Sequence, residues 1–170
     1  ITGQTIVVDG GWNFVCRRPP SKGKPLGSYT RVEARDWTRE KLVGAVNCTI
    51  PSFSTDLTRI NEKAIRHDIA LAKKHGFVGT LAVSEISITL DEYIESMEIM
   101  NDEAHGELII THHASWSTLE QNIEAAQRAE SAGAEFVLLS YPPNFYPESE
   151  QEVFDYTKAV CDATNLAVMI

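Results

Sequence analysis

The sequence predicts an α/β protein whose strands lie parallel in one sheet. From residue 42 onward, short apolar β-rich runs alternate with amphipathic helical stretches, and one strand plus one helix takes about 30 residues. The pattern completes four such units and begins a fifth strand. Each helix carries the chain back to the end of the sheet where the next strand starts. The alternation therefore requires parallel strands joined by right-handed crossovers.

The predicted strands are runs of apolar and β-branched residues bounded by turn-forming residues. They lie at 42–50, 77–83, 108–111, 136–140 and 166–170. Pro51 closes the first strand, because proline cannot donate to a sheet ladder. The first helix, over 61–75, begins at the N-cap residue Asn61 and ends before Gly76. The other three begin at a Ser or Thr three residues before a Glu, the spacing of a capping box: Thr89, Ser117 and Ser149.

Two architectures fit this order of elements. One is a doubly wound sheet, and the other is the first half of an eight-fold (β/α) barrel. A complete barrel needs roughly 250 residues, and 42–170 supply only 129, so a barrel would be cut in half. No GxGxxG follows the first strand, which weakens a dinucleotide-binding sheet.

The first 41 residues differ from the rest in charge and composition. Residues 16–41 hold eight of the 15 Lys and Arg residues against three acids, whereas 42–170 hold seven against 20. Three prolines and two glycines within 19–27 oppose both a helix and a central strand. We therefore predict an irregular basic linker or leader over 16–41. A nucleic-acid-binding tail is the alternative, but no helix face aligns these charges.

The overall composition excludes several classes of protein. The formal charge is −9 and 43% of residues are apolar, which is typical of a globular protein and unfavourable for binding nucleic acid phosphates. A membrane span would need about 18 consecutive apolar residues, and no such run occurs. The dispersed Cys16, Cys48 and Cys161 form no CxxC pair. We expect reduced thiols in a cytoplasmic protein, with no zinc site and no cofactor.

The two ends of the chain suggest a piece of something longer. It begins at Ile1 without a charged leader, so no signal peptide is expected. The string ITGQTIVVDGGW at 1–12 resembles the closing segment of short-chain dehydrogenases, so 1–15 are interpreted as a dehydrogenase-like tail. The cofactor-binding glycines and the Tyr-x-x-x-Lys of that family are absent. The resemblance therefore implies a remnant that neither binds NAD nor transfers hydride.

Residues 42–170 resemble the dihydrodipicolinate synthase / N-acetylneuraminate lyase family of Schiff-base aldolases and lyases. The motifs, in chain order, are Gly44-Ala45, Ile50-Pro51-Ser52-Phe53 with Asp56, Lys74-His75-Gly76-Phe77, Ser87-Ile88-Thr89-Leu90, Ser117-Thr118, Ala132-Gly133-Ala134-Glu135, and Tyr141-Pro142-Pro143-Asn144-Phe145-Tyr146-Pro147. The resemblance implies a partial (β/α)8 TIM barrel of about four and a half βα units. It also implies a homo-oligomer, tetrameric in the family, that joins a lysine to a keto acid such as pyruvate.

The resemblance also locates the reactive groups. The family's Schiff-base lysine lies on strand six and its proton-relay tyrosine follows strand five, whereas this chain ends at Ile170. The lysines after the leader are Lys63, Lys73, Lys74 and Lys158, all on predicted helix faces. We therefore expect the 170-residue chain to be inactive alone.

Supporting residues of the family's site have counterparts here. After strand two the family carries Gly-Thr-Thr-Gly-Glu, which holds the substrate carboxylate, and this chain has Val83 and Ser84 at the two threonines. Valine cannot donate a hydrogen bond, so only Ser84 could keep half of this clamp. In the lyase branch a tyrosine before a proline reaches the neighbouring subunit's site. Tyr146 matches it, with Tyr141 as the alternative.

Two adjacent histidines, His112 and His113, end the third predicted strand. Neighbouring strand residues point to opposite faces, so at most one of them can face the barrel mouth, and a metal pair is disfavoured. One of them is a candidate for lining the substrate pocket, and the alternative is a structural histidine. Trp116 is a candidate pocket wall or a packing residue.

Three functional hypotheses follow. The leading one is the N-terminal half of a Schiff-base lyase or aldolase barrel. The second is a non-catalytic half-barrel that self-associates through its open sheet edges. The third, resting on 1–12 alone, is a remnant of an oxidoreductase.

Overall fold

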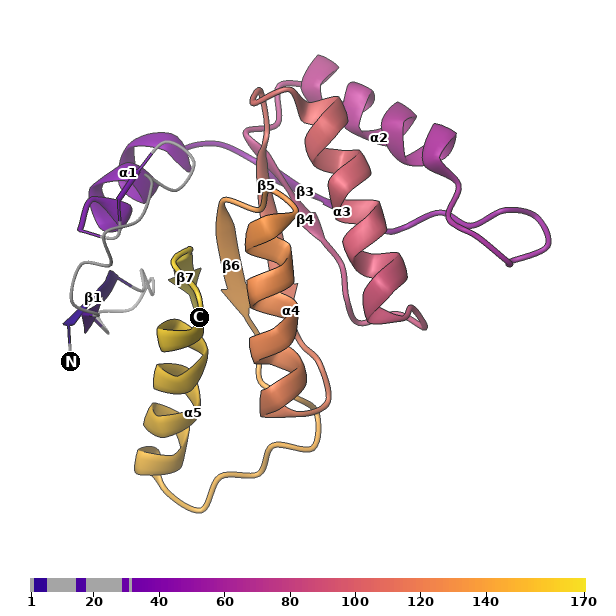
Figure 1. Cartoon of the computed structure of the whole chain (residues 1–170). Helices are drawn as coiled ribbons and strands as arrows, with labels where there is room; N and C mark the ends of the chain where they lie inside the picture. Colours follow the sequence, from indigo (N-terminus) through magenta and orange to yellow (C-terminus); the bar gives the residue numbers. More distant parts are fainter. Residues whose placement is uncertain (1, 6–14, 18–28, 31) are drawn as a thin grey trace.

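The structure is a computed structural model that describes residues 2–5, 15–17, 29–30 and 32–170. Its central feature is a five-stranded parallel sheet in which the strands follow chain order (Figure 1). They are β3 (Val46–Thr49), β4 (Gly79–Ala82), β5 (Ile109–Ala114), β6 (Phe136–Leu139) and β7 (Ala167–Met169). The helices between them are α2 (Glu62–Lys74), α3 (Leu90–Ala104), α4 (Leu119–Ser131) and α5 (Glu150–Ala163).

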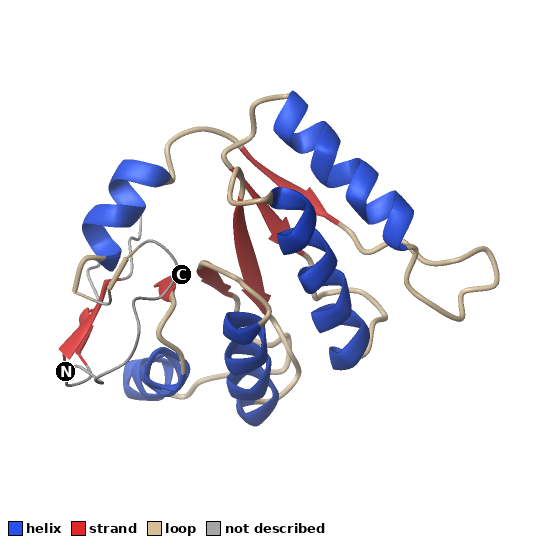
Figure 2. Cartoon of the chain, turned by 45° about the horizontal axis from the view of Figure 1, so that its top comes forward, coloured by secondary structure: helices blue, strands red, loops and turns tan. Residues whose placement is uncertain are grey.

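These four helices cover one face of the sheet (Figure 2). A single core cluster joins them to the strands, and it includes Ile65, Ile69, Met97, Met100, Ile110, Val137, Val160 and Val168. A doubly wound sheet carries helices on both faces, whereas a barrel carries its βα helices outside only. The consecutive strand order and the one-sided helix layer therefore identify an arc of a (β/α)8 barrel. The predicted partial barrel is confirmed.

The strands are aligned so that equivalent side chains form rows across the sheet. Cys48 pairs with Leu81, Leu81 with Thr111, Thr111 with Phe136, and Phe136 with Ala167. Phe136 and Ala167 belong to a second core cluster, separate from the one under the helices. This row therefore faces the inner side of the arc, and the residues next to it along each strand face the helices.

At the amino ends of the strands, α1 (Ala34–Lys41) and Tyr29 close the inner side of the arc. Trp37 packs with Tyr29, Ile109, Phe136 and Ala167 in the second cluster. The Tyr29 hydroxyl donates to Glu135 O and accepts from Ala167 N.

Helix α1 corrects the expectation of an irregular segment throughout 16–41. The prolines and glycines that oppose a helix lie within 19–27, whereas Ala34–Lys41 contains neither residue type. Trp37 and Ala34 give this stretch an apolar side that the sheet buries.

The capping predictions are largely confirmed. Asn61 Oδ1 accepts from Ala64 N, and Ser149 Oγ from Glu152 N. Thr89 and Glu92 form a complete capping box. One position was wrong: the N-cap of α4 is Thr118, not Ser117, and Thr118 accepts from Gln121 N. Thr118 has the extended backbone of an N-cap, which places Glu120 one position too early to complete a box.

Near the N-terminus, β1 (Thr2–Thr5) pairs antiparallel with β2 (Val15–Arg17). Of the dehydrogenase-like string over 1–12, only residues 2–5 lie within the described part of the chain. Within the described ranges, every helix lacks the length and apolar character needed to cross a membrane.

Candidate active site at the carboxyl ends of the strands

Polar side chains from three successive strands meet where those strands end. Ser84 and Glu85 follow β4, His113 lies near the end of β5, and Ser140 follows β6. In (β/α) barrels this edge of the sheet carries the loops that form active sites. We call Ser84, Glu85, His113, Ser115 and Ser140 the strand-end cluster.

His113 connects the three strands. Its Nε2 lies 2.9 Å from Ser140 Oγ, and its backbone carbonyl accepts a hydrogen bond of 2.8 Å from Ser84 Oγ. It pairs with Leu138 of β6 and lies two residues beyond Thr111, on the side of the sheet away from the helices. The imidazole is therefore positioned at the inner side of the arc, next to the strand ends.

Glu85 adds a negative charge beside this imidazole. Its Oε1 accepts a 2.8 Å hydrogen bond from Ser115 Oγ and lies 4.0 Å from His113 Nε2. The Glu85 side chain is exposed, so solvent screens much of its charge.

The protonation state of His113 follows from its surroundings. Burial lowers the pKa of His113, and the opposing effect of Glu85 is smaller. The ring nitrogen Nδ1 is buried with no hydrogen-bond partner, so an imidazolium would bury an unsatisfied N–H donor. His113 is a neutral imidazole at pH 7.

His112 occupies a structural position, which corrects its place among the substrate-binding candidates. It is fully buried, and its Nδ1 lies 2.9 Å from the hydroxyl of Tyr93 on α3. The same hydroxyl donates to Ala82 O and accepts from His113 N. Burial lowers the pKa of His112 to about 3. The alternation along β5 sends this ring into the helix layer, where substrate has no access.

The two candidate tyrosines differ in their surroundings. Tyr141 packs on the helix side, with its ring stacked on Phe145 and its hydroxyl 2.6 Å from Thr157 Oγ1 of α5. Thr157 already donates to Val153 O, so Tyr141 is the donor in this pair. Tyr146 is 84% exposed.

The loop after β5 is held by a residue that the sequence did not indicate. Asn122 of α4 is buried, and its side-chain amide bonds both the N–H and the C=O of Trp116 and the hydroxyl of Tyr156. Trp116 packs edge-on against Tyr93, with ring centroids 5.6 Å apart. Trp116 thus packs against the core, and its role as a pocket wall stays a prediction.

Glu85, Ser115 and Ser140 were not among the individual site residues predicted from the sequence. Each stands one to three residues beyond a strand, and that position was the only available signal. Their separation along the chain hides any local motif.

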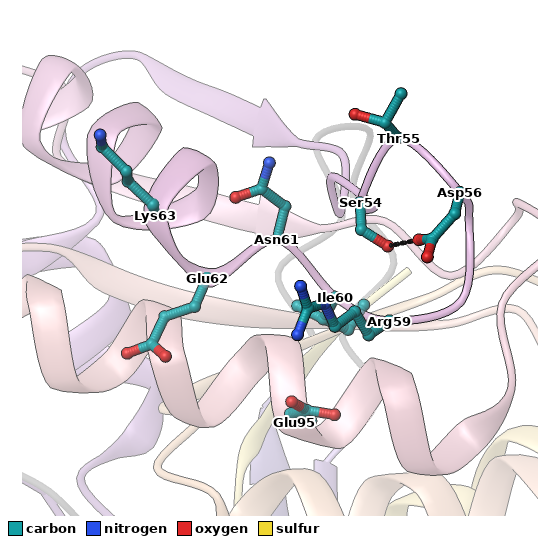
Figure 3. Close-up of a pocket in the computed structure, with 9 residues that line it drawn as sticks. All are labelled: Ser54, Thr55, Asp56, Arg59, Ile60, Asn61, Glu62, Lys63 and Glu95. Atoms are coloured by element: carbon teal, nitrogen blue, oxygen red, sulfur yellow. Dashed lines mark hydrogen bonds between the residues drawn. The ribbon is translucent and has the colours of Figure 1, made fainter.

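A separate pocket of about 780 Å³ lies at the β3–α2 loop (Figure 3). It is lined by Ser54, Thr55, Asp56, Arg59, Ile60, Asn61, Glu62, Lys63 and Glu95. Asp56 is held within its own loop by Ser54 and Thr58. None of the strand-end cluster lines this pocket, and its lining mixes charges of both signs.

The lysines of the described part of the chain all lie on helices. Lys41 belongs to α1, Lys63, Lys73 and Lys74 to α2, and Lys158 to α5. Lys73 Nζ lies 3.1 Å from Glu107 Oε1 and also donates to Glu103 O, and Lys158 pairs with Asp162. Figure 3 shows the Lys63 side chain directed away from Asp56 and Glu95. Over the same described residues, no group of three or more His, Cys, Asp or Glu side chains could hold a metal ion.

Comparison with known proteins identifies relatives of this chain. A sequence model of the dihydrodipicolinate synthetase family matches residues 57–170. The 4-hydroxy-tetrahydrodipicolinate synthase of Chloroherpeton thalassium is 27% identical over 137 residues, which are 78% of this chain and 44% of that protein. A probable 5-dehydro-4-deoxyglucarate dehydratase of Pseudarthrobacter chlorophenolicus is 29% identical over 149 residues, covering 85% of this chain and 47% of the relative.

A solved structure shows the same fold. The N-acetylneuraminate lyase from Fusobacterium nucleatum has a TM-score of 0.66 at 20% identity, covering 74% of this chain and 45% of that one. The chain thus spans about half the length of the curated relatives it matches. The dehydrogenase resemblance of 1–12 gains no support from these matches and stays a prediction. The match to the family model covers about two thirds of this chain. The chain therefore belongs to the dihydrodipicolinate synthetase family.

Proposed function

We propose that this protein takes part in Schiff-base lyase or aldolase chemistry on a small keto acid, bound at the strand-end cluster. The observation that carries the proposal is the family match over 57–170, together with the hydroxyl and imidazole groups at the carboxyl ends of β4, β5 and β6. Hydroxyls and a neutral imidazole can bind the oxygens of a keto acid and exchange protons with it. Ser84 and His113 are the sequence-predicted residues that lie there.

We further propose that the 170-residue chain does not itself form the Schiff base. That reaction needs an unprotonated amine at the barrel mouth. The described lysines instead lie on helices, and Lys41, Lys73 and Lys158 are paired with carboxylates. An ammonium held by a carboxylate has no lone pair to attack a ketone.

Tyr146 is proposed to serve a neighbouring subunit of a homo-oligomer. A tyrosine that completes another subunit's site must project from its own, and the 84% exposure of Tyr146 suits this role. Tyr141 remains the alternative, although its hydroxyl is already bound to Thr157. Cys48 carries a free thiol, which supports the proposal of a cytoplasmic protein.

A second candidate function is favoured by the open edge of the sheet. Within the described strands β3 pairs only with β4, and Val46 and Ile50 along this edge are 40% and 58% exposed. An exposed apolar edge strand is a template for pairing with another chain. The alternative is therefore a non-catalytic half-barrel that self-associates. Sedimentation at several concentrations distinguishes it, because a monomer at all concentrations excludes this alternative.

Two measurements on the 170-residue chain test the main proposal. Calorimetric titration with pyruvate is expected to show reversible binding, and absence of heat up to tens of millimolar contradicts keto-acid binding. Borohydride treatment in the presence of pyruvate, followed by mass spectrometry, is expected to leave the mass unchanged. A reduced adduct on any lysine contradicts the proposal that the chain does not form the Schiff base.

A further inference from the structure

We propose that Ser140 donates a hydrogen bond to the keto oxygen of the substrate and that His113 orients its hydroxyl for this contact. The inference deepens the proposed function and rests on it. It concerns whether the strand-end cluster binds the keto oxygen or a carboxylate oxygen of the keto acid. Ser140 is the contact residue, and His113 is a positioning residue.

At the β4 end of the site, the side chains of Val83, Ser84 and Glu85 offer no free hydrogen-bond donor. Val83 has no polar group, and the Ser84 hydroxyl already donates to His113 O at 2.8 Å. Glu85 can only accept while ionised. An acceptor oxygen of the substrate could therefore bind Ser84 only by breaking the bond that fixes the end of β5.

The tautomer of His113 determines the direction of its bond with Ser140. Its Nδ1 is buried without a partner, and orphaned buried donors are rarer than under-satisfied acceptors. The ring proton therefore lies on Nε2. His113 Nε2–H donates to Ser140 Oγ at 2.9 Å, and the hydroxyl proton of Ser140 is left for another acceptor.

Within the strand-end cluster, Ser140 is the one serine whose hydroxyl proton is not donated to another group of the cluster. Ser84 gives its proton to His113 O, and Ser115 gives its proton to Glu85 Oε1. Ser140 is half-buried, and its backbone N–H donates to Ala114 O at 3.0 Å, which fixes its position at the end of β6. Its hydroxyl is thus an oriented donor at the inner side of the arc.

The charge of the cluster favours a neutral acceptor over a carboxylate. Glu85 Oε1 lies 4.0 Å from His113 Nε2, and none of the described lysines belongs to the strand ends. A substrate carboxylate at Ser140 would lie near the Glu85 charge without a lysine counter-ion. The keto oxygen carries no net charge and accepts the same hydrogen bond.

Pyruvate and propionate distinguish binding of the keto oxygen from binding of the carboxylate, because they share a carboxylate and only pyruvate has a keto oxygen. We expect the wild-type chain to bind pyruvate about two- to tenfold more tightly than propionate, the range of one net hydrogen bond. Ser140→Ala should reduce this ratio to about one, whereas Ser140→Thr should retain it. Ser131→Ala removes an exposed helix hydroxyl and is the matched control, expected to keep the wild-type ratio.

The orientation by His113 is measured without any ligand. Nitrogen-15 NMR should show the Nε2–H tautomer in the wild type, with the His113 ring signals displaced in Ser140→Ala. An Nδ1–H tautomer overturns the inference. The inference is also overturned if the preference for pyruvate persists in Ser140→Ala, or if the wild type binds both ligands equally. In those two cases the proposed function stands. If the wild type binds neither ligand, both the inference and the proposed function are overturned.

Discussion

The hydroxyl of Tyr29 accepts a 2.9 Å hydrogen bond from the backbone N–H of Ala167, although 138 residues separate them. The same hydroxyl donates to Glu135 O. This side chain joins the segment before α1 to the amino ends of β6 and β7. Closure of the inner side of the arc therefore depends on residues that precede the first barrel strand.

Replacing Tyr29 by Phe removes both hydrogen bonds, the one to Glu135 O and the one from Ala167 N. The free energy of unfolding should fall by about 1–3 kcal/mol, measured by urea denaturation. Tyr146→Phe, which removes an exposed hydroxyl, is the control and should change stability by less than about 0.5 kcal/mol. Equal stability of Tyr29→Phe and the wild type would show that this closure contributes nothing.

The stability of the protein should decrease on acidification through the histidine range. Burial lowers the pKa of His112 to about 3 from an ordinary value of 6.5, so the unfolded state binds the additional proton. The stabilisation is complete above pH 6.5 and is lost towards pH 3, at up to about 1.4 kcal/mol per pH unit. Burial lowers the pKa of His113 in the same direction.

Urea unfolding between pH 5.5 and 7.5 measures this slope. His112→Gln should flatten it, whereas His67→Gln, which removes an exposed imidazole on α2, should not. A His112→Gln protein with the wild-type slope would mean that His112 is not the buried neutral group described.

Asn122 should be needed for the order of the strand-end loop. Replacing it by Ala leaves the N–H and C=O of Trp116 without their partners, and we expect a loss of about 2–4 kcal/mol of unfolding free energy. Amide hydrogen exchange at Trp116 should accelerate at the same time. Gln127→Ala, on the exposed side of the same helix, is the control, and unchanged exchange in Asn122→Ala would refute the role.

The open edge of β3 leads to a prediction about self-association of the chain. If copies pair through this edge, Val46→Lys combined with Ile50→Lys should shift the sedimentation of the chain toward the monomer. Leu57→Lys, at an exposed apolar residue outside the strands, is the control and should leave the distribution unchanged. An oligomer that survives the double substitution uses another surface.

The periodic part of the sequence predicts the fold well, because local signals dominate there. The alternation of elements, the cap at Asn61 and the capping box at Thr89 all appear in the structure. Helix α1 was missed because the prolines of 19–27 dominated the interpretation of the whole basic segment. What stabilises α1 is burial of Trp37 against distant strands, which local sequence does not reveal.

The site was less predictable, since it depends on register. The third strand was expected over 108–111 with the two histidines at its end, whereas β5 runs from Ile109 to Ala114 and contains both histidines. Only that register decides that His113 faces the inner side and His112 the helices. Ser140 comes into reach of His113 through the pairing of β5 with β6, and a separation of 27 residues conceals this.

The most direct test is to locate bound pyruvate on the chain by two-dimensional ¹⁵N–¹H NMR. We predict that the backbone signals of His113, Ser115 and Ser140 shift with a common dissociation constant, and that those of Arg59 and Lys63 at the β3–α2 pocket stay in place. Shifts confined to Arg59 and Lys63 would contradict the account, because the keto acid would then bind outside the strand-end cluster.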